Sequence, residues 1–184
     1  MRERRPGERI DYQVTHLEMR APPAGPLPPL PSGPETALIW AEKPPADYFL
    51  YLYQAVGGPW EWTDWLERPR AEVEAFVGDP EVALWTLMVD GWPGGFFMLD
   101  TREPGTCDLA YLGLVPRAAG RRLGPWLLGT AIRAGWQRPG VRRLTVNTCT
   151  LDHPAALGLY QRLGFEAVAR ETRSRVLTRP RGAA

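Results

Sequence analysis

The sequence is poor in the residues that build metal centres and disulfide networks. Its 184 residues include two cysteines, Cys107 and Cys149, and two histidines. The cysteines lack the spacing of metal ligands, so we expect reduced thiols in a cytosolic protein and no metal site. Lysine is nearly absent: Lys43 is the only one, and the other basic residues are arginines. Together with abundant alanine, proline and glycine, this usage is typical of a GC-rich bacterial genome.

Long apolar runs and an excess of charge of one sign are also missing. No apolar stretch approaches the length that spans a membrane, and the first residues, MRERRPGERI, lack the apolar region of a signal peptide. We therefore expect a cytoplasmic protein with no membrane partner. The formal net charge of +1 gives no electrostatic argument for a nucleic-acid partner. The hydrophobic content of 44% suits one globular domain with its own core.

The segment 1–36 differs from the rest in charge and proline content. Residues 1–13 are polar, and we expect them to be loose, whereas residues 14–20 are a candidate short strand. Residues 21–34 hold so many prolines that they predict an extended connector instead of a helix or central strand. We predict that this proline-rich extension packs on the same domain as residues 37–184.

Hydrophobic periodicity predicts alternating strands and helices in the remaining chain. The predicted helices cover residues 45–56, 70–77, 123–136 and 154–163. The predicted strands cover residues 37–41, 81–89, 95–99, 108–115 and 142–148, and a last strand starts at residue 165. Asp90-Gly91 is a hairpin turn signal, and Gly164 is a natural helix stop.

The most informative stretch runs from Asp108 to Phe165. An apolar strand pattern breaks at Pro116, a turn rich in arginine and glycine follows over residues 117–124, and a helical pattern begins at once. A strand that ends in such a turn presents unpaired backbone N–H groups and the positive end of a helix dipole, which together favour phosphate. The pattern therefore indicates a ligand with a pyrophosphate. A purely structural turn with solvated arginines is the alternative.

These elements, in this order, resemble the GNAT (Gcn5-related N-acetyltransferase) superfamily. The resemblance lies in Leu114-Val115-Pro116, in the turn from Gly120 to Gly124, and in ALGLYQRLGF at residues 156–165, which looks like the family's A-x-x-L-Y-x-x-x-G-F segment. The segment TCTLDHP at residues 148–154 looks like a signature of one bacterial subgroup. The resemblance implies an α/β fold: a mixed, mostly antiparallel central sheet flanked by helices on both faces. It also implies an acyltransferase that moves acetyl from acetyl-CoA to a primary amine by direct attack in a ternary complex.

The resemblance implies that acetyl-CoA is the co-substrate, held by the backbone after the third meander strand and by two later side chains. The candidate residues are Leu114, Val115, Gly120, Arg121, Arg122, Leu123, Gly124, Asn147 and His153. The loop departs from the family's Q/R-x-x-G-x-G/A pattern, since Ala119 replaces Gln or Arg and Arg122 replaces the first glycine. Arg122 must adopt ordinary backbone angles or carry strain, and its guanidinium could compensate by pairing with phosphate. This departure motivates the alternative of a non-catalytic acyl-CoA-binding module with a regulatory role.

Tyr160 and Asp108 are the candidate catalytic residues. Tyr160 matches the tyrosine with which family members protonate the leaving CoA thiolate; a tyrosine that merely fills the helix face is the alternative. Asp108 matches the glutamate general base of the histone-acetylating branch and would need a bridging water; a solvated carboxylate at a strand edge is the alternative. For His153, capping the last helix competes with a contact to CoA, and Asp152 is a rival cap.

The aromatic cluster WEWTDW at residues 60–65 follows the first predicted helix, where the family builds its acceptor wall. Trp62 between the carboxylates of Glu61 and Asp64 suits a cationic amine. An aromatic hinge that packs under the sheet is the alternative. The acceptor is then a small-molecule or peptide amine, and a homodimer is one possible assembly.

Overall fold

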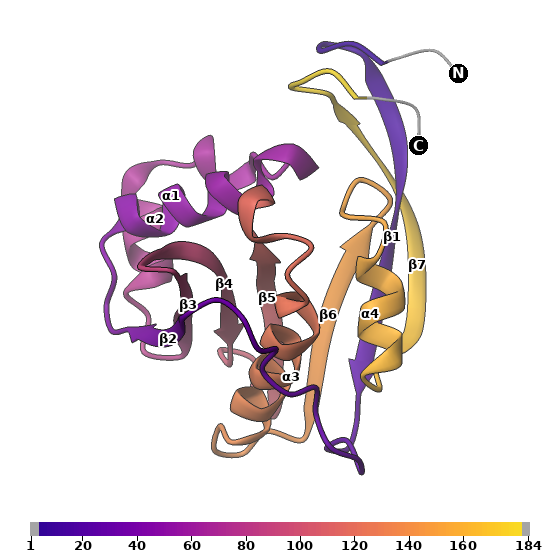
Figure 1. Ribbon diagram of the computed structural model, residues 1–184. Helices are drawn as coiled ribbons and strands as arrows, with labels where there is room; N and C mark the ends of the chain where they lie inside the picture. Colours follow the sequence, from indigo (N-terminus) through magenta and orange to yellow (C-terminus); the bar gives the residue numbers. More distant parts are fainter. Residues whose placement is uncertain (1–3, 182–184) are drawn as a thin grey trace.

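The computed structural model describes residues 4–181 as one mixed sheet with four α-helices (Figure 1). The strands are β1 (Arg9–Met19), β2 (Thr36–Ala41), β3 (Val82–Val89), β4 (Trp92–Asp100), β5 (Thr106–Leu114), β6 (Arg143–Cys149) and β7 (Glu166–Val176). The helices are α1 (Ala46–Gly57), α2 (Arg70–Val77), α3 (Leu123–Trp136) and α4 (Ala156–Arg162), with short 3₁₀ turns η1 (Gly58–Trp60), η2 (Asp64–Leu66) and η3 (Pro116–Ala118).

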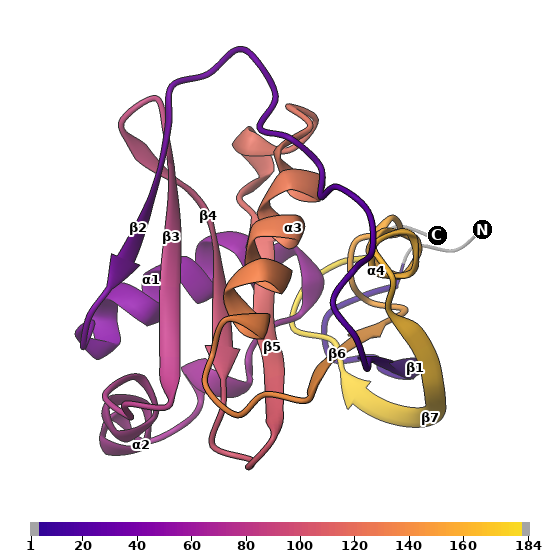
Figure 2. The same ribbon diagram turned by 90° about the horizontal axis from the view of Figure 1, so that it is seen from below.

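The seven strands lie in the order β2-β3-β4-β5-β6-β1-β7. Every neighbouring pair is antiparallel except β5 and β6, which are parallel. Helices α1 and α2 lie on one face of the sheet and α3 on the other, with α4 beside β6 and β7 (Figures 1 and 2). The predicted α/β fold, a mostly antiparallel sheet with helices on both faces, is confirmed.

Each face of the sheet has its own hydrophobic core. Leu123, Leu127 and Leu128 of α3 pack with side chains of β3 to β6 on one face. On the other face, Phe49 and Leu52 of α1 belong to a second core with residues of α2 and the meander β3–β5. Because α1 and α2 cover only the β3–β5 half, the β6–β1–β7 half of that face is left without a helix (Figure 2).

The N-terminal strand corrects the sequence prediction. We expected residues 1–13 to be loose and a short strand over residues 14–20, but β1 already begins at Arg9 and runs for 11 residues. It pairs with β6 on one side and β7 on the other, so tertiary partners extend a strand whose ends are too polar to be recognised from the sequence. Residues 1–3 of the expected loose segment lie outside the described residues.

The proline-rich connector crosses the surface of α3 between β1 and β2 (Figure 2). It contains neither helix nor strand, as predicted. Leu27 and Pro28 lie against Gly129 of α3, where a Cβ built on the glycine would come 3.2 Å from the Pro28 ring. The connector is thus packed on the same body as the sheet.

Most predicted helices and turns occur where the pattern placed them. Helices α2 and α3 match the predicted ranges, and the turn between β3 and β4 has positive φ at both Asp90 (50°) and Gly91 (83°), as a tight hairpin requires. Helix α4 is shorter than predicted because the N–H groups of Ala155 and Ala156 donate to Nδ1 and the carbonyl oxygen of His153, which forms a turn before the helix. Within residues 4–181, no helix is both long and apolar enough to cross a membrane.

Candidate functional site

The candidate site begins where the two parallel strands part. β5 and β6 pair only through Thr106↔Arg143, Cys107↔Leu144 and Asp108↔Thr145. The register between β4 and β5 then shifts, leaving Ala110 as an extra residue on β5. From there to Leu114, β5 has a strand partner only on its β4 side among the described residues. The edge of β5 toward β6 therefore offers backbone groups that an extended amide-containing ligand can use.

The loop after β5 has the backbone of an anion-binding turn. Gly120 has φ of 79° and Arg122 has φ of 60°, and α3 begins at the next residue, Leu123. No side chain caps the first turn of α3, so its N–H groups remain available. Backbone N–H groups that converge at a left-handed residue before a helix favour phosphate.

Of the two possibilities for Arg122, ordinary backbone angles or strain, the structure has the strained one: its backbone is left-handed. A non-glycine residue in the left-handed region costs about 1–2 kcal/mol, and glycine would not incur this cost. The position therefore has a backbone conformation that glycine adopts without cost, while it carries a cation. The Arg122 side chain is exposed and has no ion-pair or hydrogen-bond partner within residues 4–181, so it does not block the loop.

One of the arginines near Arg122 forms an ion pair within the protein, and another does not within residues 4–181. Arg121 donates to Asp90 Oδ2 at 2.8 Å and ties the loop to the β3–β4 turn. Arg117 is exposed and, like Arg122, is without a carboxylate or hydrogen-bond partner in the described part of the chain. Two guanidinium groups thus remain for an anionic ligand at this end of α3.

Tyr160 lies on α4 and belongs to the core that also contains residues of α3 and β6. Its side chain is 7% exposed and packs edge-to-face on Phe165, with ring centroids 5.9 Å apart. Burial raises the pKa of Tyr160, and the carboxylates of Asp152 and Asp108 raise it further. Its hydroxyl has no hydrogen-bond partner within the described residues, so a neutral phenol stands ready to donate one.

Asp108 lies on the face of β5 opposite the core residues Cys107 and Leu109. Its Oδ1 accepts a hydrogen bond of 2.6 Å from Thr145 Oγ1. Burial raises the pKa of Asp108 above its usual value; the Thr145 bond opposes this, and the nearby charge of Asp100 adds to it. A carboxyl group with a raised pKa in a mostly buried position is suited to accept a proton.

A cavity of about 500 Å³ opens beside Asp108. The lining residues are Asp100, Arg102, Glu103, Thr106, Asp108 and Thr145. Asp100 is paired with Arg102 at 2.6 Å and Glu103 with Arg143 at 2.7 Å, whereas Asp108 has no cationic side chain within ion-pair distance among the described residues. The unpaired carboxylate is the one that sits where β5 and β6 part.

Of the two carboxylates in the aromatic cluster at residues 60–65, Glu61 is buried and Asp64 is exposed. Glu61 is 1% exposed, and its Oε2 accepts from the N–H and the hydroxyl of Thr178, each at 3.0 Å. Its carboxylate therefore faces inward and holds the segment after β7. Asp64 presents its carboxylate to solvent, 3.9 Å from Arg175.

Trp62, in the loop after α1, contacts both the loop after β6 and the aromatic side chains of α1 and β5. Its indole N–H donates to Asp152 Oδ1 at 3.2 Å, and its ring packs against Tyr53 and Tyr111. Asp152 Oδ2 accepts from Thr148 Oγ1 and from the Cys149 N–H, both at 2.8 Å. Asp152 thus links the loop after α1 to the end of β6. No local pattern in the sequence predicts this contact.

The remaining candidates lie along β6 and before α4. Asn147 is exposed and faces His16 of β1 across the ladder. His153 is exposed, packs edge-to-face on Trp60 at 5.3 Å, and accepts the Ala155 N–H on Nδ1. His153 therefore closes the turn before α4, while Asp152 holds β6.

The sequence analysis missed the contributions of β1 and β7 to this region. His16 Nε2 lies 2.9 Å from Glu171 Oε1 on the helix-free half of the sheet. Arg175 Nη2 donates to Thr63 Oγ1 at 2.7 Å. Both contacts join residues more than a hundred positions apart, so only the tertiary structure could reveal them.

Comparisons with known proteins show the same fold and identify a family. Residues 34–165 match the Acetyltransferase (GNAT) family. A GCN5-related N-acetyltransferase from Sphaerobacter thermophilus is 22% identical, with a TM-score of 0.58 over 97% of this chain and 54% of that one. A GCN5-related N-acetyltransferase from Kribbella flavida is 17% identical, with a TM-score of 0.57 over 88% of this chain and 56% of that one. The chain thus spans little more than half the length of these two proteins.

A third similar structure is the aminoglycoside N-acetyltransferase AAC(6')-Iy in complex with CoA, which is 18% identical, with a TM-score of 0.54 over 76% of this chain and 93% of that one. At these identities the structures show a shared fold. No curated protein matches the chain. The family match covers well over half of the sequence, and the strand parting and the loop before α3 lie inside it. The chain belongs to the GNAT family of acetyltransferases.

Proposed function

We propose that the protein transfers an acetyl group from acetyl-CoA to a primary amine by direct attack. The observation that carries the proposal is the combination of an unpaired β5 edge with an uncapped helix N-terminus at the end of the same strand. The first feature fits the amides of a pantetheine arm, and the second fits a pyrophosphate. A ligand that has both groups in one extended chain is CoA.

The proposed CoA site uses the backbone more than side chains. Leu114 ends β5, and its main-chain groups would meet the pantetheine amides. Val115, the other candidate, uses its own main chain within the protein: its N–H donates to the Gly94 carbonyl, and its carbonyl accepts from the Ala118 and Ala119 N–H groups. The N–H groups of residues 120–124 would hold the pyrophosphate, with the exposed guanidinium of Arg122 pairing with its oxygens. Asn147 and His153 flank the arm from the β6 side.

We assign the proton transfers to Asp108 and Tyr160, which lie on opposite sides of the point where β5 and β6 separate. The amine approaches from the face that carries Asp108 and loses its proton to this carboxylate through a water. The nitrogen then attacks the thioester carbon, and the carbon–sulfur bond breaks. Tyr160 gives its hydroxyl proton to the departing thiolate. The exposed carboxylate of Asp64 is the member of the aromatic cluster that can attract a cationic acceptor.

Thiol release from acetyl-CoA over a panel of amines tests the proposal. The panel should include a lysine peptide, a peptide N-terminus, a polyamine and an aminoglycoside, because the geometry selects the amine group and not its carrier. Acetyl transfer to at least one amine, with the acetylated product identified by mass spectrometry, is the expected result. Binding of CoA without turnover on any amine would contradict it.

A second function is favoured by one observation, the left-handed arginine in the phosphate loop. A loop that tolerates this strain could serve an acyl-CoA-binding module that regulates without turnover. The two functions separate in Tyr160→Phe. If the protein is an enzyme, this variant binds CoA as before but loses about 10²- to 10⁴-fold in turnover, the usual contribution of a general acid. Tyr53→Phe, a buried tyrosine of the other core, is the matched control.

A further inference from the structure

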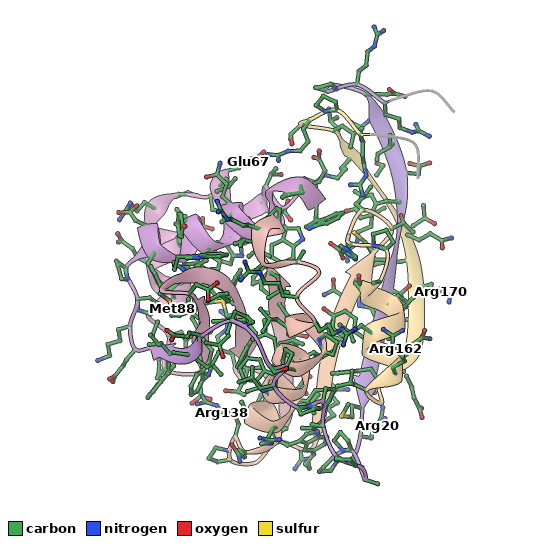
Figure 3. The ribbon with its side chains drawn as sticks, in the orientation of Figure 1. Arg20, Glu67, Met88, Arg138, Arg162 and Arg170 are labelled. Carbon is green, nitrogen blue, oxygen red and sulfur yellow. The ribbon has the colours of Figure 1, made fainter. Side chains whose placement is uncertain are left out.

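The outer strand β7 is an exposed edge. It ends the sheet order and has β1 as its only strand partner among the described residues. Ten of its 11 residues are exposed, including Val168 at 54% and Val176 at 45%. Figure 3 shows Arg170 at this outer side of the sheet. A long unpaired edge strand is a template for pairing with another strand, and natural proteins protect or use such edges.

Pairing of β7 with β7 of a second copy is restricted by geometry. A twofold axis that relates two antiparallel edge strands runs perpendicular to the sheet, so it preserves the two faces. Residues that face each other in an antiparallel pair have their side chains on the same face of the sheet. Because side chains alternate between faces along a strand, this is possible only when the axis lies midway between one residue and its own copy; that residue names the axis. The ladder to β1 is regular from Ala169 to Val176, so this rule holds over that range.

Among the registers centred on residues 170–174, near the middle of the regular range, charge selects one. Axes through Arg170, Glu171 or Arg173 would place a charged residue against its own copy, and an axis through Ser174 would place Arg173 against Arg175. Facing like charges destabilise an antiparallel pair. An axis through Thr172 avoids every such contact.

The register centred on Thr172 is also complementary. Glu171 faces Arg173 of the second copy, and the symmetry makes this contact twice. Thr172 meets its own copy, a favourable cross-strand pair. The remaining facing pairs are neutral: Arg170 with Ser174, and Ala169 with Arg175.

We propose that two copies of this chain associate along β7, with the twofold axis at Thr172, and join their sheets into one continuous sheet. A second copy fits this edge better than a different strand of the molecule. Pairing β7 with the opposite edge strand, β2, would leave a free edge at each end and would propagate into a filament. The antiparallel β7 pair closes on itself and covers both copies of the exposed edge.

A pair of charge variants tests the register. Glu171→Arg sets two arginine side chains against each other across the axis, at positions 171 and 173, and Arg173→Glu sets two glutamate side chains against each other at the same positions. Each variant alone therefore faces like charges, and we expect its dimer dissociation constant to rise roughly tenfold or more. Mixed in equal amounts, the two variants can form a mixed dimer that faces opposite charges in both contacts.

In the mixed dimer, the first variant contributes arginine at both positions and the second contributes glutamate at both. Each of the two contacts across the axis then joins one arginine to one glutamate, so both are complementary. The mixture should therefore form a heterodimer about as strong as the wild-type dimer.

Analytical ultracentrifugation over a concentration series measures these species, and circular dichroism verifies that each variant is folded. Arg170→Glu is the matched control, because it reverses a charge on the same strand but faces Ser174. It should dimerise like the wild-type protein. A monomeric wild-type protein would overturn the proposal, as would single variants that dimerise normally or a mixture that stays monomeric. These outcomes are independent of acetyl transfer, so they do not depend on the proposed function.

Discussion

At the scale of single residues, Asp108 has opposite effects on stability and on catalysis. Burial raises its pKa in the folded protein, so the stability that this group contributes is present below its unfolded pKa and is lost as the pH rises through the folded pKa. Above its folded pKa, the ionised carboxylate thus destabilises the fold. A general base must nevertheless be ionised, so activity should fall as the pH is lowered through the same raised pKa.

Asp108→Asn should therefore increase the free energy of unfolding at pH 7, since the amide can still accept the Thr145 bond without a buried charge. Turnover should fall about 10²- to 10⁴-fold. Urea unfolding at acidic and neutral pH and steady-state kinetics measure the two effects. A variant that is less stable at neutral pH, or fully active, would refute the assignment.

Asp100→Asn is the matched control, because Asp100 faces Asp108 in the ladder and lines the same cavity. Burial acts to raise the pKa of Asp100, but the side-chain and backbone hydrogen bonds from Arg102 outweigh it and leave the pKa lowered. The stability from Asp100 is present above its unfolded pKa and is lost as the pH falls through the folded pKa. The control should lower stability at neutral pH and leave turnover nearly unchanged.

Two variants of Arg122 separate the effect of its backbone strain from the effect of its charge. Arg122→Gly relieves the left-handed strain, offset in part by the greater freedom of glycine in the unfolded chain, and should stabilise the protein by about 0.5–1 kcal/mol. Arg122→Ala keeps the strain and removes the guanidinium, so its stability should match the wild-type protein. Both variants should bind CoA more weakly, measured by calorimetry at low and high salt. Unchanged affinity in the alanine variant would show that the guanidinium does not reach the phosphates.

At the scale of elements, the end of α1 is fitted closely to the loop that follows it. A Cβ added to Gly57 would lie 2.2 Å from ring atoms of Trp62. Gly57→Ala should therefore displace Trp62 and its bond to Asp152, with a loss of about 1–3 kcal/mol that exceeds the gain in helix propensity. Gly25→Ala has open space around the new methyl group and should be nearly neutral. Equal thermal stability of the two variants would contradict this account.

The sequence predicted elements well where local signals were strong. The limits of α2 and α3 follow from a 3.6-residue apolar period, and the Asp90-Gly91 turn from residues that accept positive φ. The turn between β5 and α3 was located in the same way. Glu61 was different: its burial depends on Thr178, 117 positions away, and no local pattern encodes that contact. The full extent of β1 likewise depends on partners on both sides.

At the scale of the whole molecule, β1 supports the half of the sheet that lies beyond the strand parting. Leu17 is 1% exposed and lies in the core that also contains residues of α3 and α4. Leu17→Ala should cost about 2–5 kcal/mol of unfolding free energy, as for other buried leucines. Ile39→Ala, on the edge strand β2 and 51% exposed, should cost far less. Similar losses in chemical denaturation would mean that β1 is not an integral part of the core.

The position of β1 also has a consequence for synthesis. Its two neighbours, β6 and β7, begin at Arg143 and Glu166, so β1 has no strand to pair with until these much later strands have been synthesised. Contacts between such distant segments form slowly, because a long loop has to close first. Until then, the meander β3–β5 and its helices can assemble while β1 has no strand on either side. The nascent protein thus passes through a stage with an unprotected strand, when a chaperone would be most useful to it.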